Sequence, residues 1–124
     1  MRDLILVAAG GALGATARHL AARAAILLTP ATFPWGTFVI NITGCLAMGV
    51  VAGLANAGSI SPSARLFVAT GLLGGYTTFS AFGLEAQGLL SDGRVGAVLA
   101  YVLGQVLLAM VGVILGLAIA RRIG

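Results

Sequence analysis

One stretch near the middle of the chain decides the fold: residues 71–83 read GLLGGYTTFSAFG. The pair Gly74 and Gly75 and the β-branched pair Thr77 and Thr78 are weak helix formers. They interrupt an apolar stretch that extends from about residue 65 to residue 90, so we predict a membrane helix that is broken near its middle. A broken helix frees carbonyl oxygens that can coordinate a cation such as Na⁺, and it frees amide groups that can face an anion.

Three further apolar stretches are each long enough for the roughly 20 residues that a membrane helix needs, and they cover about residues 4–28, 35–54 and 95–119. Pro30 follows the end of the first stretch, and Trp35 begins the second at a position typical of an interfacial anchor. Turn-forming residues separate the other stretches, at residues 56–62 and 91–94. The sequence therefore predicts an all-α membrane protein with four transmembrane helices in one domain, residues 1–124.

The composition indicates that lipid, rather than water, surrounds most of the surface. Hydrophobic residues make up 60% of the chain and charged residues 8%, whereas about 25% of residues are charged in soluble domains. The net charge of +4 comes from seven arginines and three acidic residues. Most of these arginines lie near the ends of apolar stretches, where guanidinium groups reach lipid headgroups. The basic charge therefore does not indicate nucleic acid as a partner.

The positions of the arginines bear on membrane topology, because four spans place both termini and the second loop on one side. That side carries four arginines, which are Arg2, Arg65, Arg121 and Arg122, and the other side carries three, which are Arg18, Arg23 and Arg94. A bias of one charge barely specifies an orientation. We therefore hypothesise that the chain inserts in both orientations and that the two forms pair as an antiparallel homodimer.

Several glycines are spaced four residues apart, which lets helix backbones approach closely. Four such pairs occur: Gly10 and Gly14, Gly49 and Gly53, Gly71 and Gly75, and Gly112 and Gly116. These pairs fit tight packing within one subunit as well as packing between two subunits, and the sequence does not decide between the two arrangements.

Polar residues within membrane spans are costly and are therefore candidates for function. Thr37 and Asn41 lie four residues apart on one face of the second span. The Asn41 amide either bonds to a neighbouring helix or turns its donors toward a path for an anion. Phe79 and Phe82 share a face of the third span, and electropositive ring edges can accompany a small anion without holding it tightly. In isolation, such a pair is more typical of core packing.

Other polar residues can extend this track. Tyr101 and Gln105 share a face of the fourth span. Glu85 either continues the track or is a carboxylate near the membrane interface, and Arg18 either attracts anions to an entrance or bonds to loop carbonyls. The sequence contains no pair of carboxylates at catalytic spacing, no phosphate-binding loop and no set of metal ligands, so it does not indicate an enzyme.

Along nearly its whole length the chain resembles the small dual-topology fluoride channels of microbes that are called Fluc or CrcB. The resemblance rests on three motifs, which are GALGATAR at residues 11–18, Gly36-Thr37-Phe38 with Asn41 and Gly44, and GGYTTFSAF at residues 74–82. The last of these motifs is highly specific. The chain departs from the family at Ala81 and Gly83, where relatives often have hydroxyl residues, and at Gln105, in a region where serine is common.

The resemblance implies an antiparallel homodimer in the lipid bilayer with two fluoride pathways, each lined by both subunits. The pathway residues would be Asn41, Thr78, Phe79, Ser80, Phe82 and Tyr101, with Arg18, Thr37, Glu85 and Gln105 as accessory residues. Backbone carbonyls of Gly74 and Thr77 from both copies would hold a structural Na⁺ at the dimer axis. The implied function is passive export of fluoride across the inner or plasma membrane, which protects cytoplasmic enzymes.

Two other functions also fit a small protein with four spans. A proton-coupled exporter of the small multidrug type requires a carboxylate in mid-membrane, whereas Asp3 lies at the start of the first span and Glu85 lies off-centre in the third. A noncatalytic assembly subunit would use its polar residues only for bonds between helices. Dye efflux that depends on Glu85 would favour the exporter, and absence of ion flux in liposomes would favour the subunit.

Overall fold

The computed structural model describes all of residues 1–124, and its only regular elements are helices. Four helices are long and apolar enough to cross a membrane: Arg2–Leu28, Trp35–Asn56, Pro62–Ser91 and Val95–Ile123. The predicted all-helical fold with four membrane-capable helices is thus confirmed. The first, second and fourth of these are continuous, and they are α1 (Arg2–Leu28), α2 (Trp35–Asn56) and α6 (Val95–Ile123).

The third span is irregular. It begins as α3 (Pro62–Arg65), continues as the π-helical segment η1 (Leu66–Leu73) and the short α4 (Gly74–Tyr76), and resumes after a break as α5 (Phe79–Ser91). The break consists of Thr77 (φ −78°, ψ 156°) and Thr78 (φ −149°, ψ 118°), which both have extended backbone. The predicted interruption is confirmed, and it falls on the threonine pair rather than on the glycine pair.

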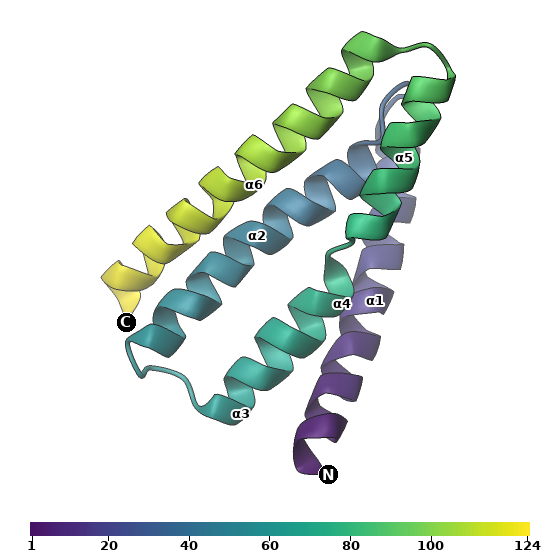
Figure 1. The fold of residues 1–124 in the computed structure, drawn as a ribbon. Coiled ribbons are helices and arrows are strands. Elements are labelled where there is room, and N and C mark those ends of the chain that lie inside the picture. Colours follow the sequence, from purple (N-terminus) through teal and green to yellow (C-terminus); the bar gives the residue numbers. More distant parts are fainter.

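Figure 1 shows how the four spans are arranged. α2 and α6 run side by side, α1 packs against η1 and α4, and α5 packs against α6. Both termini and the α2–α3 connection lie at one end of the bundle, as four successive spans require (Figure 1). The break between α4 and α5 lies well inside the length of the bundle, where Thr78 bonds to Asn41 of α2.

Glycines form the contacts between the paired helices. Gly10 of α1 lies against Gly71 of η1, where a Cβ atom added at Gly10 would stand 3.0 Å from the Gly71 Cα. Gly49 of α2 lies against Gly116 of α6 in the same way, because a Cβ atom added at Gly49 would stand 3.0 Å from the Gly116 Cα. At every glycine of the four pairs, an added Cβ would meet atoms of another segment of the same chain. The glycines of all four pairs therefore take part in close helix packing within one subunit, which is one of the two arrangements that the sequence left open.

Two helix ends differ from the predicted ones. The third span begins at Pro62 rather than near residue 65, because the Ser61 hydroxyl accepts a hydrogen bond from the Ala64 N–H (3.1 Å) and proline suits the first helical position. α6 continues to Ile123 rather than ending near residue 119, so Arg121 and Arg122 lie in its last turn. Positive charge is favourable there because the helix dipole is negative at that end.

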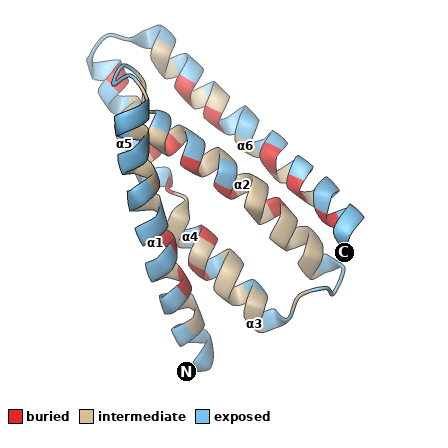
Figure 2. Cartoon of the chain, turned by 180° about the vertical axis from the view of Figure 1, so that it is seen from behind, coloured by how far each residue is buried: buried red, intermediate tan, exposed pale blue.

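Most large apolar side chains lie on the surface. Only 16 of the 124 residues are buried, and the outward faces of the helices are exposed over much of their length (Figure 2). The small core includes Ile40, Phe82, Leu89 and Tyr101. An apolar surface of this extent requires lipid or another protein chain to cover it.

Candidate functional site

Asn41 of α2 fixes the break in the third span. Its Nδ2 donates to the Thr78 carbonyl oxygen (3.0 Å), and its Oδ1 accepts from the Thr78 N–H (2.8 Å). Without these bonds the break would leave both backbone groups of Thr78 unpaired, which is costly inside a membrane. Of the two roles that the sequence left open for Asn41, the structure shows the bond to a neighbouring helix.

The break also releases carbonyl oxygens, and those of Gly74 and Thr77 are two of them. In a continuous helix, the Gly74 carbonyl would accept from the Thr78 N–H and the Thr77 carbonyl from the Ala81 N–H. Here the Thr78 N–H donates to Asn41, and the Ala81 N–H donates to the Thr78 hydroxyl (3.2 Å). The Gly74 and Thr77 carbonyls have therefore lost their helical donors, which leaves their lone pairs available to another partner.

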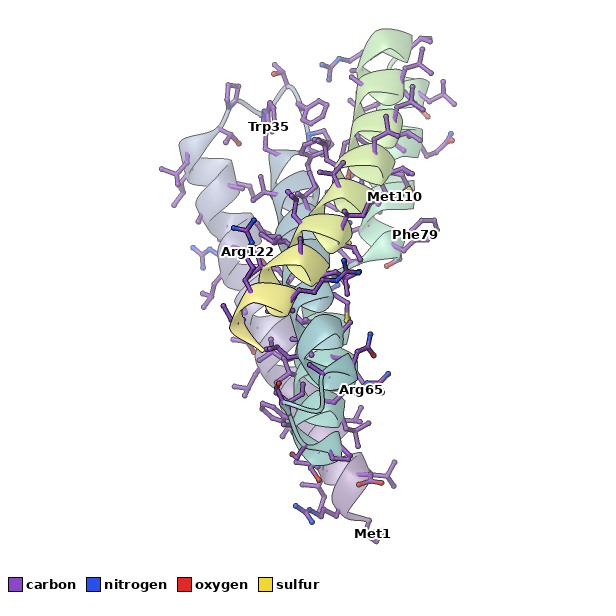
Figure 3. All side chains as sticks on the ribbon, turned by 90° about the vertical axis from the view of Figure 1, so that its left-hand side faces the viewer. Met1, Trp35, Arg65, Phe79, Met110 and Arg122 are labelled. Carbon is purple, nitrogen blue, oxygen red and sulfur yellow. The ribbon has the colours of Figure 1, made fainter.

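Aromatic rings extend from the break into the bundle. Phe79 and Phe82 lie in the first turn of α5, with ring centroids 5.4 Å apart and an interplanar angle of 39°. Phe82 is buried, and its ring centroid lies 5.3 Å from that of Tyr101 on α6. Phe79 is 82% exposed, and it projects from the side of the bundle that also carries Met110 (Figure 3). These rings form a continuous row from the surface to the interior.

Thr37, Glu85 and Tyr101 come from three helices and form one hydrogen-bonded group. The Thr37 hydroxyl donates to Glu85 Oε1 (2.8 Å), and the Tyr101 hydroxyl donates to Glu85 Oε2 (2.6 Å). Tyr101 is fully buried. Glu85 is therefore joined to the polar residues of α2 and α6 and is not an isolated interfacial carboxylate.

A cavity of about 360 Å³ lies beside the break. Its lining residues come from α2, the third span and α6, and they are Asn41, Cys45, Thr77, Thr78, Phe79, Phe82, Gln105, Val106, Ala109 and Met110. This lining contains no charged side chain, so an anion in the cavity would meet only neutral groups. Gln105 is 5% exposed, and neither its amide nitrogen nor its amide oxygen has a hydrogen-bond partner.

Two further residues that the sequence predicted for the site, Ser80 and Arg18, do not line this cavity. The Ser80 hydroxyl is 3.3 Å from the hydroxyl of Thr78, so Ser80 adjoins the lining. Arg18 is on α1, which contributes no residue to the cavity. Arg18 and Arg23 both lie within the second half of α1 rather than in the loop that follows it.

Sequence reasoning did not identify Cys45 and Met110 as lining residues. Cys45 lies four residues after Asn41 on the same face of α2, so helical periodicity could have placed it beside Asn41. Met110 is an exposed apolar residue of α6, and its pattern does not differ from that of residues that face lipid. No sequence signal could have singled it out.

The family model described as "CrcB-like protein, Camphor Resistance (CrcB)" matches residues 5–117, a range that includes every residue of the cavity. The chain belongs to the CrcB family. The resemblance seen in the sequence motifs is thereby confirmed. Together with its four apolar helices, family membership makes this CrcB chain a multi-pass membrane protein.

Named relatives match this CrcB chain over nearly its full length. It is 48% identical to the Fluoride-specific ion channel FluC 2 of Nitrobacter hamburgensis, over 98% of both chains. It is 48% identical to the Fluoride-specific ion channel FluC of Rhodopseudomonas palustris, over 96% of this chain and 97% of the relative. It is 46% identical to the protein of the same name from Hyphomonas neptunium, over 99% of this chain and 98% of the relative.

Proposed function

We propose that this CrcB protein is a fluoride channel rather than an enzyme, and that it lets fluoride leave the cytoplasm passively. Relatives that are 46–48% identical carry the name fluoride-specific ion channel. The observation that carries the proposal is the cavity beside the break, which offers amide, hydroxyl and ring-edge groups but no fixed charge. A conducting site must be favourable enough to enter and weak enough to leave, and neutral groups meet both conditions. Export would lower the toxicity of fluoride to cytoplasmic enzymes.

The residues around the cavity would act together on a partly dehydrated fluoride ion. The ring edges of Phe79 and Phe82 carry partial positive charge and would face the ion. The hydroxyls of Thr78 and Ser80 lie at the N-terminal end of α5, where the helix dipole favours an anion. Asn41 retains one Nδ2 hydrogen after its bond to the Thr78 carbonyl. Tyr101 extends the row of rings toward Glu85.

We propose that a second, antiparallel copy completes the pathway. Phe79 lines the cavity although it is 82% exposed, and a ring that accompanies an ion must be shielded from lipid. A second copy in the inner or plasma membrane would provide this shield. The near balance of four arginines against three supports insertion in both orientations.

The same dimer would bring the breaks of two copies together, and we propose that their carbonyls hold a structural Na⁺. The Gly74 and Thr77 oxygens fit such an ion, because they have lost their helical donors and hard cations bind oxygen ligands. A bound cation would contribute a fixed positive charge between the two broken helices.

No observation favours the proton-coupled exporter. That mechanism needs a carboxylate in mid-membrane that exchanges protons for cations. Both oxygens of Glu85 accept hydrogen bonds, from Thr37 and from Tyr101, and no carboxylate lines the cavity beside the break.

Fluoride efflux from liposomes that contain the purified chain tests the proposed function. We expect Phe79→Ile and Phe82→Ile each to lower the initial rate about tenfold, because isoleucine fills similar space but has no electropositive ring edge. Phe67→Ile is a matched control, since Phe67 lies in η1 and does not line the cavity. Wild-type vesicles that release no fluoride would refute the function, and unchanged rates in both cavity variants would remove the aromatic pair from the pathway.

A further inference from the structure

A second cavity lies at the end of the bundle that carries both termini. Its volume is about 380 Å³, and its lining residues are Ala55, Ile60, Pro62, Arg65, Leu66 and Thr70. These residues come from the end of α2, the α2–α3 connection and the start of the third span, so the cavity lies where that span enters the lipid (Figure 1). We call it the Arg65 groove. It shares no residue with the cavity beside the break.

The Arg65 groove contains one charged side chain, and its charge is positive. Arg65 is exposed on the outer side of the third span (Figure 3). No carboxylate lines the groove, so the N–H donors of the guanidinium have no acidic partner there. Ala55, Ile60 and Leu66 form an apolar wall beside it. A cation next to an apolar wall, at the end of a membrane span, matches the anionic headgroup and the acyl chains of a lipid.

Thr70 adds an unused hydroxyl to the groove. The hydroxyls of Thr16, Thr43 and Thr77 each donate to the carbonyl four residues earlier in the chain, which is a common way to satisfy a threonine in a helix. The Thr70 hydroxyl makes no such bond, although Thr70 is exposed on the side of a membrane span. A hydroxyl without a partner is unfavourable in hydrocarbon, so this position favours a ligand with an acceptor.

The π-helical register of η1 brings Arg65 and Thr70 to the same groove. In a regular α-helix, two side chains five residues apart point about 140° away from each other. In a π-helix each carbonyl bonds to the N–H five residues later, so η1 places Thr70 one turn beyond Arg65 on the same face. Such turns are frequent at functional sites. This one aligns a cation at the membrane boundary with a hydroxyl one turn deeper.

We propose that the Arg65 groove binds one anionic glycerophospholipid of the surrounding membrane. The lipid phosphate accepts from the Arg65 guanidinium. An ester carbonyl, which lies deeper in the bilayer than the phosphate, accepts from the Thr70 hydroxyl, and an acyl chain covers the apolar wall. The lipid therefore matches the groove in charge, in depth and in hydrophobicity. The site is separate from the fluoride cavity, so the proposal does not depend on fluoride conduction.

Thermal unfolding of the purified chain in detergent, with added lipid, tests the proposal independently of membrane orientation. Phosphatidylglycerol should raise the unfolding temperature of the wild type more than phosphatidylcholine does, because a ligand that binds the folded chain stabilises it. For Arg65→Gln, we expect the phosphatidylglycerol concentration at the half-maximal shift to rise about fivefold. Thr70→Val keeps the shape and the arginine but removes the hydroxyl, and it should raise this concentration about threefold.

Two matched controls separate the groove from its surroundings. Arg2→Gln removes the same charge at the same end of the bundle, but Arg2 does not line the groove. Thr16→Val removes an exposed hydroxyl that already bonds to the Ala12 carbonyl (2.8 Å). Both controls should keep the wild-type dependence on phosphatidylglycerol. Sodium phosphate should produce no shift in any of the proteins, since free phosphate has no acyl chain for the apolar wall.

Three results would overturn the proposal. Equal dependence on phosphatidylglycerol in Arg65→Gln and Arg2→Gln would show that the lipid responds only to the overall positive charge. An equal shift with phosphatidylcholine in the wild type would show that the groove does not select an anionic headgroup. Loss of the dimer in Arg65→Gln, with an unchanged lipid dependence in Thr70→Val, would show that a second copy of the chain covers the groove instead.

Discussion

At the scale of single residues, Asn41 replaces the backbone bonds that the broken helix cannot make for itself. We expect Asn41→Ala to lower the free energy of unfolding in detergent by about 3 kcal/mol, because the Thr78 N–H and carbonyl would both lose their partner inside the protein. Asn56→Ala is the matched control, since Asn56 is exposed at the end of the same helix. Equal stability of both variants would show that the break holds its shape without the Asn41 amide.

The roles of the individual amides could be predicted only in part. The sequence placed Asn41 and Gln105 on polar faces of membrane helices, and it predicted a partner helix or an anion path for the Asn41 amide alone. It could not tell which amide finds a partner, because that depends on where the extended Thr77 and Thr78 backbone lies relative to α2. The Thr37–Glu85–Tyr101 group was beyond prediction for the same reason, since its members come from three helices.

At the scale of helices, the pair α2 and α6 depends on the absence of side chains at its contact. A Cβ atom at Gly116 would stand 2.7 Å from the Val50 nitrogen and 2.9 Å from the Gly49 carbonyl carbon. These backbone atoms cannot yield unless the helices separate, so we expect Gly116→Ala to lower the free energy of unfolding by about 2 kcal/mol.

Gly96→Ala is the matched control on the same helix, because an added Cβ at Gly96 meets nothing within 4 Å. Alanine favours a helix more than glycine does, so this control should raise the free energy of unfolding by up to about 1 kcal/mol. Chemical unfolding in detergent measures both. A Gly116→Ala chain as stable as the control would mean that the two helices are not held at this distance.

The helices themselves were largely predictable, because hydropathy and weak helix formers are local properties. The start at Pro62 was missed, although a serine cap followed by proline could have indicated it. The π-helical turns of η1 were not predictable, since nothing in residues 66–73 marks them. They accompany the contact of Gly71 with Gly10, and these residues are far apart in the sequence.

At the scale of the whole molecule, we expect the arginines to determine the orientation of the bundle in the membrane. Both termini and the α2–α3 connection lie at one end (Figure 1), and this end carries Arg2, Arg65, Arg121 and Arg122. Arg94 lies at the opposite end, and Arg23 lies in the half of α1 that approaches it. Because four arginines oppose three, the removal of two or three should be enough to impose one orientation.

Arg23→Gln with Arg94→Gln leaves four arginines against one and should insert with both termini in the cytoplasm. Arg65→Gln with Arg121→Gln and Arg122→Gln leaves one against three and should insert the opposite way. If the channel is an antiparallel dimer, each set alone should give little fluoride efflux, and co-expression should restore it because each set supplies one orientation. Labelling of a cysteine added at either terminus reports the orientation directly. Full efflux from a set that labels in one orientation only would contradict the antiparallel dimer and leave fluoride conduction itself standing.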